Sequence, residues 1–249
     1  MHAETMALER GTPLPLERER VLAAMLGIPA LIRHPVWRRA DPEQGRGRGV
    51  VLIPGFGVGG SSLALVHSWL AARGYKPAGA RIGLNVGCTT DLVKRLERRV
   101  KEMADRTGRR VVLLGQSRGG WLGRLVAVRR PELVRGLVMA GSPVLDPLGA
   151  HSKVVRVAQF LARLSAMGVP GLLNAACLSG DCMRTHRAAL GAALPVPALA
   201  VYSRQDAIVP WELCLDPCAE CVEVSSSHTG MALDPAFFAA VQPKLAEWA

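Results

Sequence analysis

The sequence of 249 residues has no apolar run long enough to span a lipid bilayer, so a transmembrane helix is not predicted. It opens polar and acidic, without the apolar core of about 7 to 15 residues that marks a signal peptide. We therefore expect a cytoplasmic location, or secretion if a leader has been removed. No low-complexity linker or internal repeat divides the chain, which favours a single domain.

Acidic and aromatic residues are both few. Asp and Glu number 20 against 31 Lys and Arg, which gives a net charge of +11, and aromatic residues make up 4%. The basic residues are spread over the chain and no nucleic-acid-binding motif is present, so we expect no nucleic-acid partner. A weak association with an anionic lipid surface is compatible with this charge.

The chain does contain an alternation of apolar strand-like runs and amphipathic segments. Strands are expected at 49–54, 78–84, 110–115, 134–140, 196–202 and 221–225, and helices at 61–73, 90–106, 119–129 and 234–248. This order predicts one α/β domain over residues 1–249, with a mostly parallel sheet of about six strands and helices on both faces. Residues 1–45 are expected to pack as an N-terminal arm, and about 145–194 to form a small helical lid.

The most specific motif is the G-x-S-x-G pentapeptide at residues 115–119, which follows four apolar residues and precedes a helical pattern. Such a sharp strand-to-helix turn lifts the serine hydroxyl above the sheet edge, and glycines are needed where a Cβ would collide. The next backbone N–H opens a helix and can donate to an oxyanion. Ser117 is therefore a candidate nucleophile.

A nucleophilic serine needs a base and an orienting acid, which in this architecture follow it along the chain. Asp206 follows the strand predicted at 196–202, and His228 follows the one at 221–225. Asp146, after the strand at 134–140, is an alternative acid, although it is equally suited to cap a turn with Pro147. The strand-to-loop context favours Asp206.

An earlier glycine-rich loop at residues 55–60 follows the strand at 49–54 and offers a second oxyanion donor, the amide of Phe56. This loop lacks the Gly-Lys-Ser/Thr ending of a P-loop. It also lacks the acidic residue expected about 20 positions after a dinucleotide-binding G-x-G-x-x-G. A nucleotide site is therefore disfavoured.

Four segments together resemble the α/β-hydrolase superfamily, closest to its bacterial lipase- and esterase-like members, over residues 48–248. They are Pro54-Gly55-Phe56, Gly115-Gln116-Ser117-Arg118-Gly119-Gly120, Asp206-Ala207-Ile208-Val209-Pro210 and Ser227-His228-Thr229-Gly230-Met231. The resemblance implies a Ser117, Asp206, His228 triad with the amides of Phe56 and Arg118 as oxyanion hole. Two departures are Pro54, where a histidine often precedes the glycine, and Arg118, where many members carry an apolar side chain.

The resemblance implies a serine hydrolase that cleaves carboxylic esters of small molecules through an acyl-enzyme, without a metal or cofactor. A thioesterase or acyltransferase on the same triad is the main alternative, and a non-catalytic protein that binds apolar ligands is another. The acyl length and the oligomeric state stay open.

The lid carries apolar residues that are candidates for an acyl pocket, although packing onto the domain body is the default explanation for most of them: Phe160, Leu161, Leu164, Met167, Leu172 and Leu173. Six cysteines are either disulfide-bonded or free. Cys177 and Cys182 lie in the lid, Cys214, Cys218 and Cys221 lie between the acid and base loops, and Cys88 stands apart in the sequence. Cys218-x-x-Cys221 has no second matching pair, so a zinc site there is disfavoured.

Overall fold

The computed structural model describes residues 25–249 and contains a six-stranded sheet in which every strand pairing is parallel. The spatial order is β2-β1-β3-β4-β5-β6. The bounds are β1 Gly49–Ile53, β2 Lys76–Gly79, β3 Val111–Gln116, β4 Val134–Ala140, β5 Ala198–Tyr202 and β6 Glu220–Glu223. The predicted sheet of about six strands is thus confirmed.

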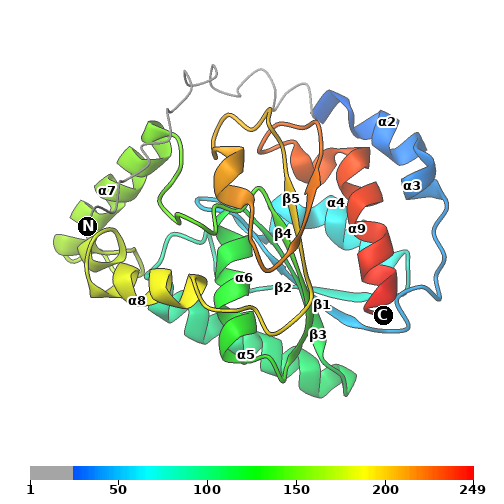
Figure 1. The fold of residues 1–249 in the computed structure, drawn as a ribbon, viewed down its shortest axis with the longest axis horizontal. Helices are drawn as coiled ribbons and strands as arrows, with labels where there is room; N and C mark the ends of the chain where they lie inside the picture. Colours follow the sequence, from blue (N-terminus) through cyan, green and yellow to red (C-terminus); the bar gives the residue numbers. More distant parts are fainter. Residues whose placement is uncertain (1–24) are drawn as a thin grey trace, which may run out of the picture.

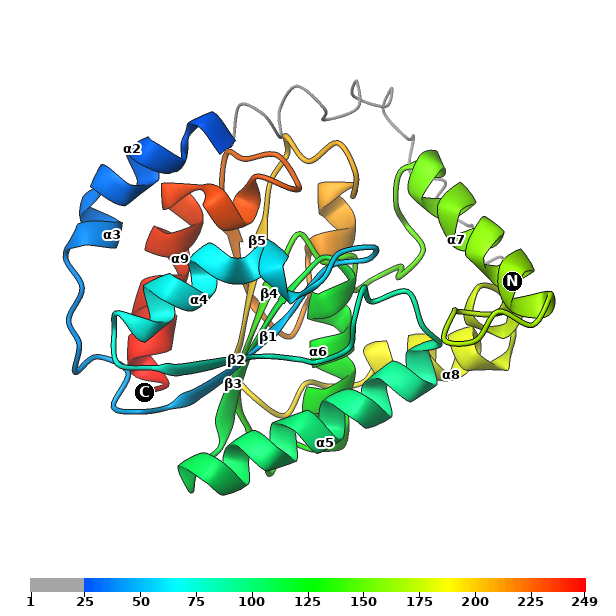
Figure 2. The same cartoon turned by 180° about the vertical axis from the view of Figure 1, so that it is seen from behind.

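Helices cover both faces of the sheet (Figures 1 and 2). On one face lie α5 (Thr89–Thr107) and α6 (Arg118–Arg129), and on the other α4 (Ala64–Ala71) and α9 (Pro235–Glu247). Short 3-10 turns are η1 (Gly60–Leu63), η2 (Ala175–Cys177), η3 (Trp211–Cys214) and η4 (Met231–Leu233). This is the three-layer arrangement that the alternation of strands and helices predicts.

The central strands are buried on both faces, which explains their continuous apolar sequences. Along β1, Val51 and Ile53 pack into the core under α5 and α6, whereas Val50 and Leu52 pack into the core under α4 and α9. Strand β3 divides its side chains in the same way. Because every side chain of β1 and β3 is covered, the carboxyl ends of these strands are firmly placed.

The second strand is shorter and earlier than the predicted 78–84. The chain leaves the sheet after Gly79 because Arg81, Gly83 and Asn85 all adopt positive φ angles, of 57°, 70° and 52°. These angles are incompatible with an extended strand. Ala80 and Ile82 are nevertheless buried in the core. They are apolar because the loop that carries them packs against the core, although it is not a strand.

The predicted lid segment contains α7 (Ser152–Ala166), η2 and α8 (Asp181–Leu190), and residues 152–190 are called the cap below. In Figures 1 and 2 the cap lies on the side of the molecule opposite α2 (Ile28–Arg33) and α3 (Pro35–Arg38).

Of the predicted arm, residues 1–24 lie outside the described part. Over residues 25–45 the chain packs on the domain, since Trp37 contacts Phe238 with ring centroids 5.6 Å apart. Within residues 25–249 no helix combines the length and apolarity needed to cross a membrane.

Candidate active site

The turn between β3 and α6 places Ser117 in a strained conformation, with φ 53° and ψ −123°. The adjacent glycines have no space for a side chain. A Cβ on Gly115 would lie 2.4 Å from the backbone of Gly119, and one on Gly119 would lie 2.2 Å from the carbonyl oxygen of Ile53. The serine is therefore held at a fixed point beyond the end of β3, as the pentapeptide predicts.

The acid and base candidates are in direct contact. Nδ1 of His228 and Oδ2 of Asp206 are 2.6 Å apart, and both side chains are buried. The other carboxylate oxygen of Asp206 accepts hydrogen bonds from the backbone N–H groups of Ile208, at 2.9 Å, and Val209, at 2.7 Å. These bonds fix the carboxylate so that it faces the imidazole, which sets the orientation of the ring.

Two contacts join the loops that carry these residues, and a third holds the loop after β5 in shape. The side-chain amide of Gln116, next to Ser117, donates to the carbonyl oxygen of His228 at 3.0 Å. The hydroxyl of Ser203 accepts from the backbone of Gln205 and of Ser226, which ties the loop after β5 to the loop after β6.

The turn after β4 also makes room for the acid and base. Gly141 adopts φ 54°, and a Cβ on it would lie 3.2 Å from Nδ1 of His228 and 3.3 Å from Oδ2 of Asp206. A glycine is therefore suited to this position on both conformational and steric grounds. No specific sequence signal marks Gly141, because it resembles any glycine that follows a strand.

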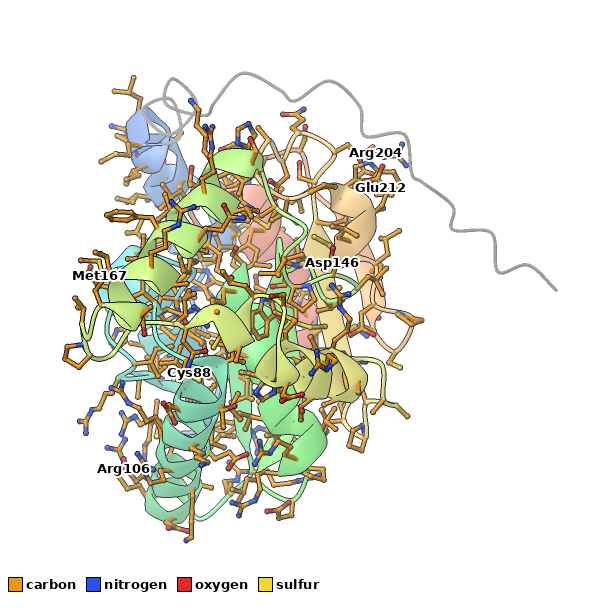
Figure 3. The ribbon with its side chains drawn as sticks, turned by 90° about the vertical axis from the view of Figure 1, so that its left-hand side faces the viewer. Cys88, Arg106, Asp146, Met167, Arg204 and Glu212 are labelled. Atoms are coloured by element: carbon orange, nitrogen blue, oxygen red, sulfur yellow. The ribbon has the colours of Figure 1, made fainter. Side chains whose placement is uncertain are left out.

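The alternative acid, Asp146, has a different partner. Its Oδ1 lies 2.5 Å from the guanidinium of Arg187 in α8, and the two side chains are 39% and 55% exposed. Figure 3 labels Asp146, which is part of the segment between β4 and the cap. Between the two candidates, Asp206 is the carboxylate that contacts His228.

An apolar pocket of about 80 Å³ adjoins Ser117. Its walls include Phe56 and Trp121 from the body, Ile208 and Val209 after Asp206, and several residues of the cap and its approach: Leu148, Val154, Val155, Ala158, Leu173, Cys177, Leu178 and Met183. The cap thus forms one side of the pocket.

Most of the predicted pocket residues are not among those that line it. Of the six, Leu173 lines the pocket, whereas Phe160 and Met167 point outward and are 56% and 79% exposed. Figure 3 shows Met167 at the outer edge of the molecule. The reason is the rotation of α7, whose smaller residues Val154, Val155 and Ala158 face the pocket while Phe160 faces solvent.

The side chain of Arg118 places a buried positive charge beside the pocket. Its guanidinium donates to the carbonyl oxygens of Asn85 and Gly87, both at 2.9 Å, and to the hydroxyl of Thr89 at 3.2 Å. Burial lowers the pKa of Arg118 from 12.5 to about 10, so it remains protonated at neutral pH. The sequence marked Arg118 as a departure from the resemblance, but not the loop that holds its side chain.

The glycine-rich loop at residues 55–60 is anchored by a residue that the sequence did not reveal. Asn85 is fully buried, and its side-chain amide donates to the carbonyl oxygen of Pro54 at 2.7 Å. Its own carbonyl oxygen accepts from Arg118. Asn85 therefore links the loop that precedes Phe56 to the residue that follows Ser117. The positive φ of Asn85 is one that Asn tolerates better than most residues.

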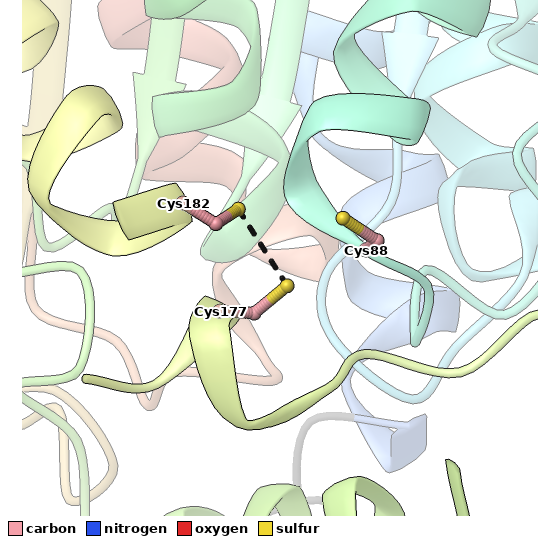
Figure 4. Close-up of side chains that lie close together, drawn as sticks. All are labelled: Cys88, Cys177 and Cys182. Atoms are coloured by element: carbon pink, nitrogen blue, oxygen red, sulfur yellow. Dashed lines mark hydrogen bonds between the residues drawn. The ribbon is translucent and has the colours of Figure 1, made fainter. Parts of the chain in front are cut away.

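The six cysteines, all within the described residues, are free thiols in the structure. Cys88 does not stand apart, as its position in the sequence suggested: it lies beside Cys177 and Cys182 (Figure 4). Cys218 and Cys221 are exposed, and in the described part of the chain the only grouping with metal-ligand spacing is that of Cys88, Cys177 and Cys182.

Comparison with known proteins identifies the fold. The chain is similar to the monoacylglycerol lipase of Paleococcus ferrophilus, with a TM-score of 0.58 and 19% identity, over 84% of this chain and 97% of that one. The chain has the α/β-hydrolase fold. It is also similar to the Bacillus licheniformis lipase BlEst2, with a TM-score of 0.60 and 15% identity, over 84% of this chain and 94% of the lipase.

A third α/β-hydrolase structure of similar likeness is the thioesterase domain from the curacin biosynthetic pathway, with a TM-score of 0.54 and 17% identity, over 84% of this chain and 93% of the domain. No protein-family model and no curated protein sequence matches the chain. At such identities the likeness establishes the fold, and the reaction has to be argued from the site.

Proposed function

We propose that the protein is a serine hydrolase that cleaves carboxylic esters through an acyl-enzyme on Ser117. The observation that carries the proposal is the hydrogen-bonded Asp206–His228 pair, joined through Gln116 to the strained turn that bears Ser117. An apolar pocket lies beside that serine. The sheet supplies the three residues from the ends of β3, β5 and β6, in the order that a Ser-Asp-His triad has in this fold.

The reaction proceeds in two halves. Ser117 Oγ attacks the ester carbonyl while His228 Nε2 takes the hydroxyl proton, and that proton then goes to the departing alkoxide as the C–O bond breaks. A water molecule next gives its proton to His228 and attacks the acyl-enzyme, which releases the acid and restores Ser117. Asp206 holds the ring with Nδ1 protonated and stabilises the imidazolium that forms twice per cycle.

The oxyanion of each tetrahedral intermediate binds to two backbone N–H groups, those of Phe56 and Arg118. Arg118 is the first residue of α6, where amides have no partner within the helix and the helix dipole favours negative charge. Gly55 brings the first loop close to the serine, since a Cβ built on Gly55 would be 3.4 Å from the Cβ of Ser117. Such donors typically contribute about 3 kcal/mol each to transition-state stabilisation.

The pocket favours a short acyl group. Its volume of about 80 Å³ is far below the roughly 300–1,000 Å³ of pockets that enclose drug-sized ligands. Its walls are almost entirely apolar, which suits an alkyl chain. We infer that a short acyl chain fits best, since each buried methylene adds about 0.8 kcal/mol only while space remains.

The test is the rate on p-nitrophenyl esters from acetyl to palmitoyl, for wild type, Ser117→Ala and a matched Ser61→Ala, which removes an exposed hydroxyl. Ester hydrolysis should be lost in Ser117→Ala and retained in Ser61→Ala. A fluorophosphonate should label Ser117 in the wild type. If labelling occurs but thioesters react faster than the matching oxygen esters, the enzyme is a thioesterase. If neither labelling nor turnover occurs, the proposal is wrong.

A further inference from the structure

Three thiols from separate parts of the chain meet beside the pocket, and one of them, that of Cys177, lines it. Cys88 immediately precedes α5, Cys177 ends η2, and Cys182 lies in the first turn of α8. The three sulfur atoms all lie within 4.8 Å of one another, and those of Cys177 and Cys182 are 3.6 Å apart. Figure 4 shows the side chains converging from the body and from η2 and α8 of the cap.

This spacing is close to that of a three-thiolate metal site. Three atoms within 4.8 Å of one another can all be reached from a central point at no more than about 2.8 Å. Zinc–thiolate bonds measure about 2.3 Å, so an inward movement of roughly half an ångström by each sulfur completes the coordination. Soft d10 ions such as Zn²⁺ and Cu⁺ are the ones that thiolates prefer.

The charge around the cluster favours a bound anionic complex. The guanidinium of Arg118 is buried within electrostatic range of all three cysteines, and one of its nitrogens donates to the carbonyl of Gly87, the residue before Cys88. In the described part of the chain its hydrogen-bond acceptors are two carbonyls and one hydroxyl, all of them neutral. Three thiolates with one Zn²⁺ carry a net charge of −1, which complements a buried cation.

Polar groups also surround the sulfur atoms. The hydroxyl of Thr90 lies 3.5 Å from the sulfur of Cys182 and 3.0 Å from Nε2 of His186, and Oδ1 of Asn174 lies 3.4 Å from the sulfur of Cys177. Groups of this kind orient ligating side chains in metal sites. The three protein ligands leave one tetrahedral position to water.

We propose that Cys88, Cys177 and Cys182 bind one soft d10 metal ion through three thiolates, which ties the cap to the body at the pocket wall. Binding of Zn²⁺ replaces three S–H bonds by three Zn–S bonds and releases three protons, without oxidation or reduction. Because Cys177 also lines the pocket, the ion fixes one wall of the acyl site.

Reduced, metal-free full-length protein is titrated with Zn²⁺ in competition with a chromophoric chelator, and with Co²⁺ to detect thiolate-to-cobalt charge-transfer absorption. One equivalent should bind with that absorption. Cys88→Ser and Cys182→Ser should each weaken binding by at least about 100-fold, whereas Cys218→Ser, at an exposed cysteine, should bind like the wild type. Absence of stoichiometric binding, or equal binding by Cys88→Ser, would overturn the proposal.

A second measurement uses only the wild type and so does not depend on how the variants fold. Zn²⁺ should protect Cys88, Cys177 and Cys182 together from an alkylating reagent, while Cys218 and Cys221 stay reactive. If peptide mapping instead finds a Cys177–Cys182 disulfide that forms in a glutathione buffer even with Zn²⁺ present, the pair is a redox site and the metal proposal fails. Neither readout involves ester hydrolysis, so its outcome is independent of the proposed function.

Discussion

The turn that bears Ser117 and the cap that covers the pocket differ in how deeply their residues are buried. In α6, which follows the serine, 10 of 12 residues are buried, whereas in α7 of the cap only Ala158 and Ala162 of 15 are buried. The proposed nucleophile therefore precedes a helix in which almost no side chain can change without disturbing the core. The cap side of the pocket is formed by a largely exposed helix whose residues can change at little cost in stability, so we expect substitutions there to act on selectivity.

We expect the largest effect from adding a side chain in the closely packed turn that bears Ser117. Gly119→Ala places a Cβ 2.2 Å from the carbonyl oxygen of Ile53, a backbone atom that cannot rotate away. We expect a loss of at least about 3 kcal/mol in unfolding free energy, measured by urea denaturation. Gly60→Ala is the matched control, because a Cβ there has no atom within 4 Å. Equal stability of the two variants would show that the turn is less tightly packed than the structure implies.

The next largest effect concerns the acid. Asp206→Asn keeps the side-chain shape but removes the charge that faces His228, and the Ser-His-Asp precedent from serine proteases is a loss of about 10⁴-fold in kcat. Asp146→Asn disrupts a partly exposed ion pair with Arg187 and should change kcat less than about twofold. Both are measured on p-nitrophenyl acetate. A larger loss in Asp146→Asn than in Asp206→Asn would reverse the assignment of the acid.

The same contrast explains which features the sequence could predict. The turn at Ser117, the strand at Val134–Ala140 and the Asp206 and His228 loops were all predicted, because each follows from a local pattern of strand, glycine and polar residue. Strand β4 matches its predicted bounds, since all of its residues except Arg135 are buried and Leu137–Ala140 form an apolar run.

What the sequence could not supply depends on contacts between distant segments. Asn85 and Pro54 are 31 residues apart, and Cys88 meets Cys182 across 94 positions. The face that α7 turns toward the pocket could not be predicted for a related reason. Phe160 is apolar at helical spacing, and only the position of the pocket decides that the smaller Val154, Val155 and Ala158 face inward. Apolar periodicity indicates an amphipathic helix without specifying what it covers.

An intermediate effect tests how the loop that carries Phe56 is held. Asn85→Ala leaves the carbonyl of Pro54 without the hydrogen bond from the Asn85 side chain, which costs about 1–3 kcal/mol of stability. The loop then holds the amide of Phe56 less firmly, and we expect kcat to fall by about tenfold with little change in KM. Leu84→Ala, at the exposed neighbouring residue, is the control. A change confined to KM would place Asn85 in substrate binding instead.

On the cap, a substitution should alter selectivity more than rate. Leu173→Ala enlarges the pocket and should move the optimum of kcat/KM toward longer acyl chains, at a cost of about 2–3 kcal/mol in stability because the residue is buried. Met167→Ala, at a highly exposed position of the same cap, should leave the chain-length profile unchanged. The profile is measured across the ester series. An unchanged optimum in Leu173→Ala would mean that the acyl chain lies elsewhere.

The smallest effect is expected on the outer face of α7, where exposed Val157 and Phe160 lie among the basic residues Lys153, Arg156 and Arg163. We propose that this face associates weakly with anionic lipid, since each basic residue near such a surface contributes about 1 kcal/mol. Phe160→Ser should reduce sedimentation with phosphatidylglycerol vesicles and leave hydrolysis of soluble esters and thermal stability unchanged. Because Phe160 supports neither the pocket nor the core, a fall in soluble-ester activity would mean that the cap is coupled to the turn at Ser117 more closely than its exposure indicates.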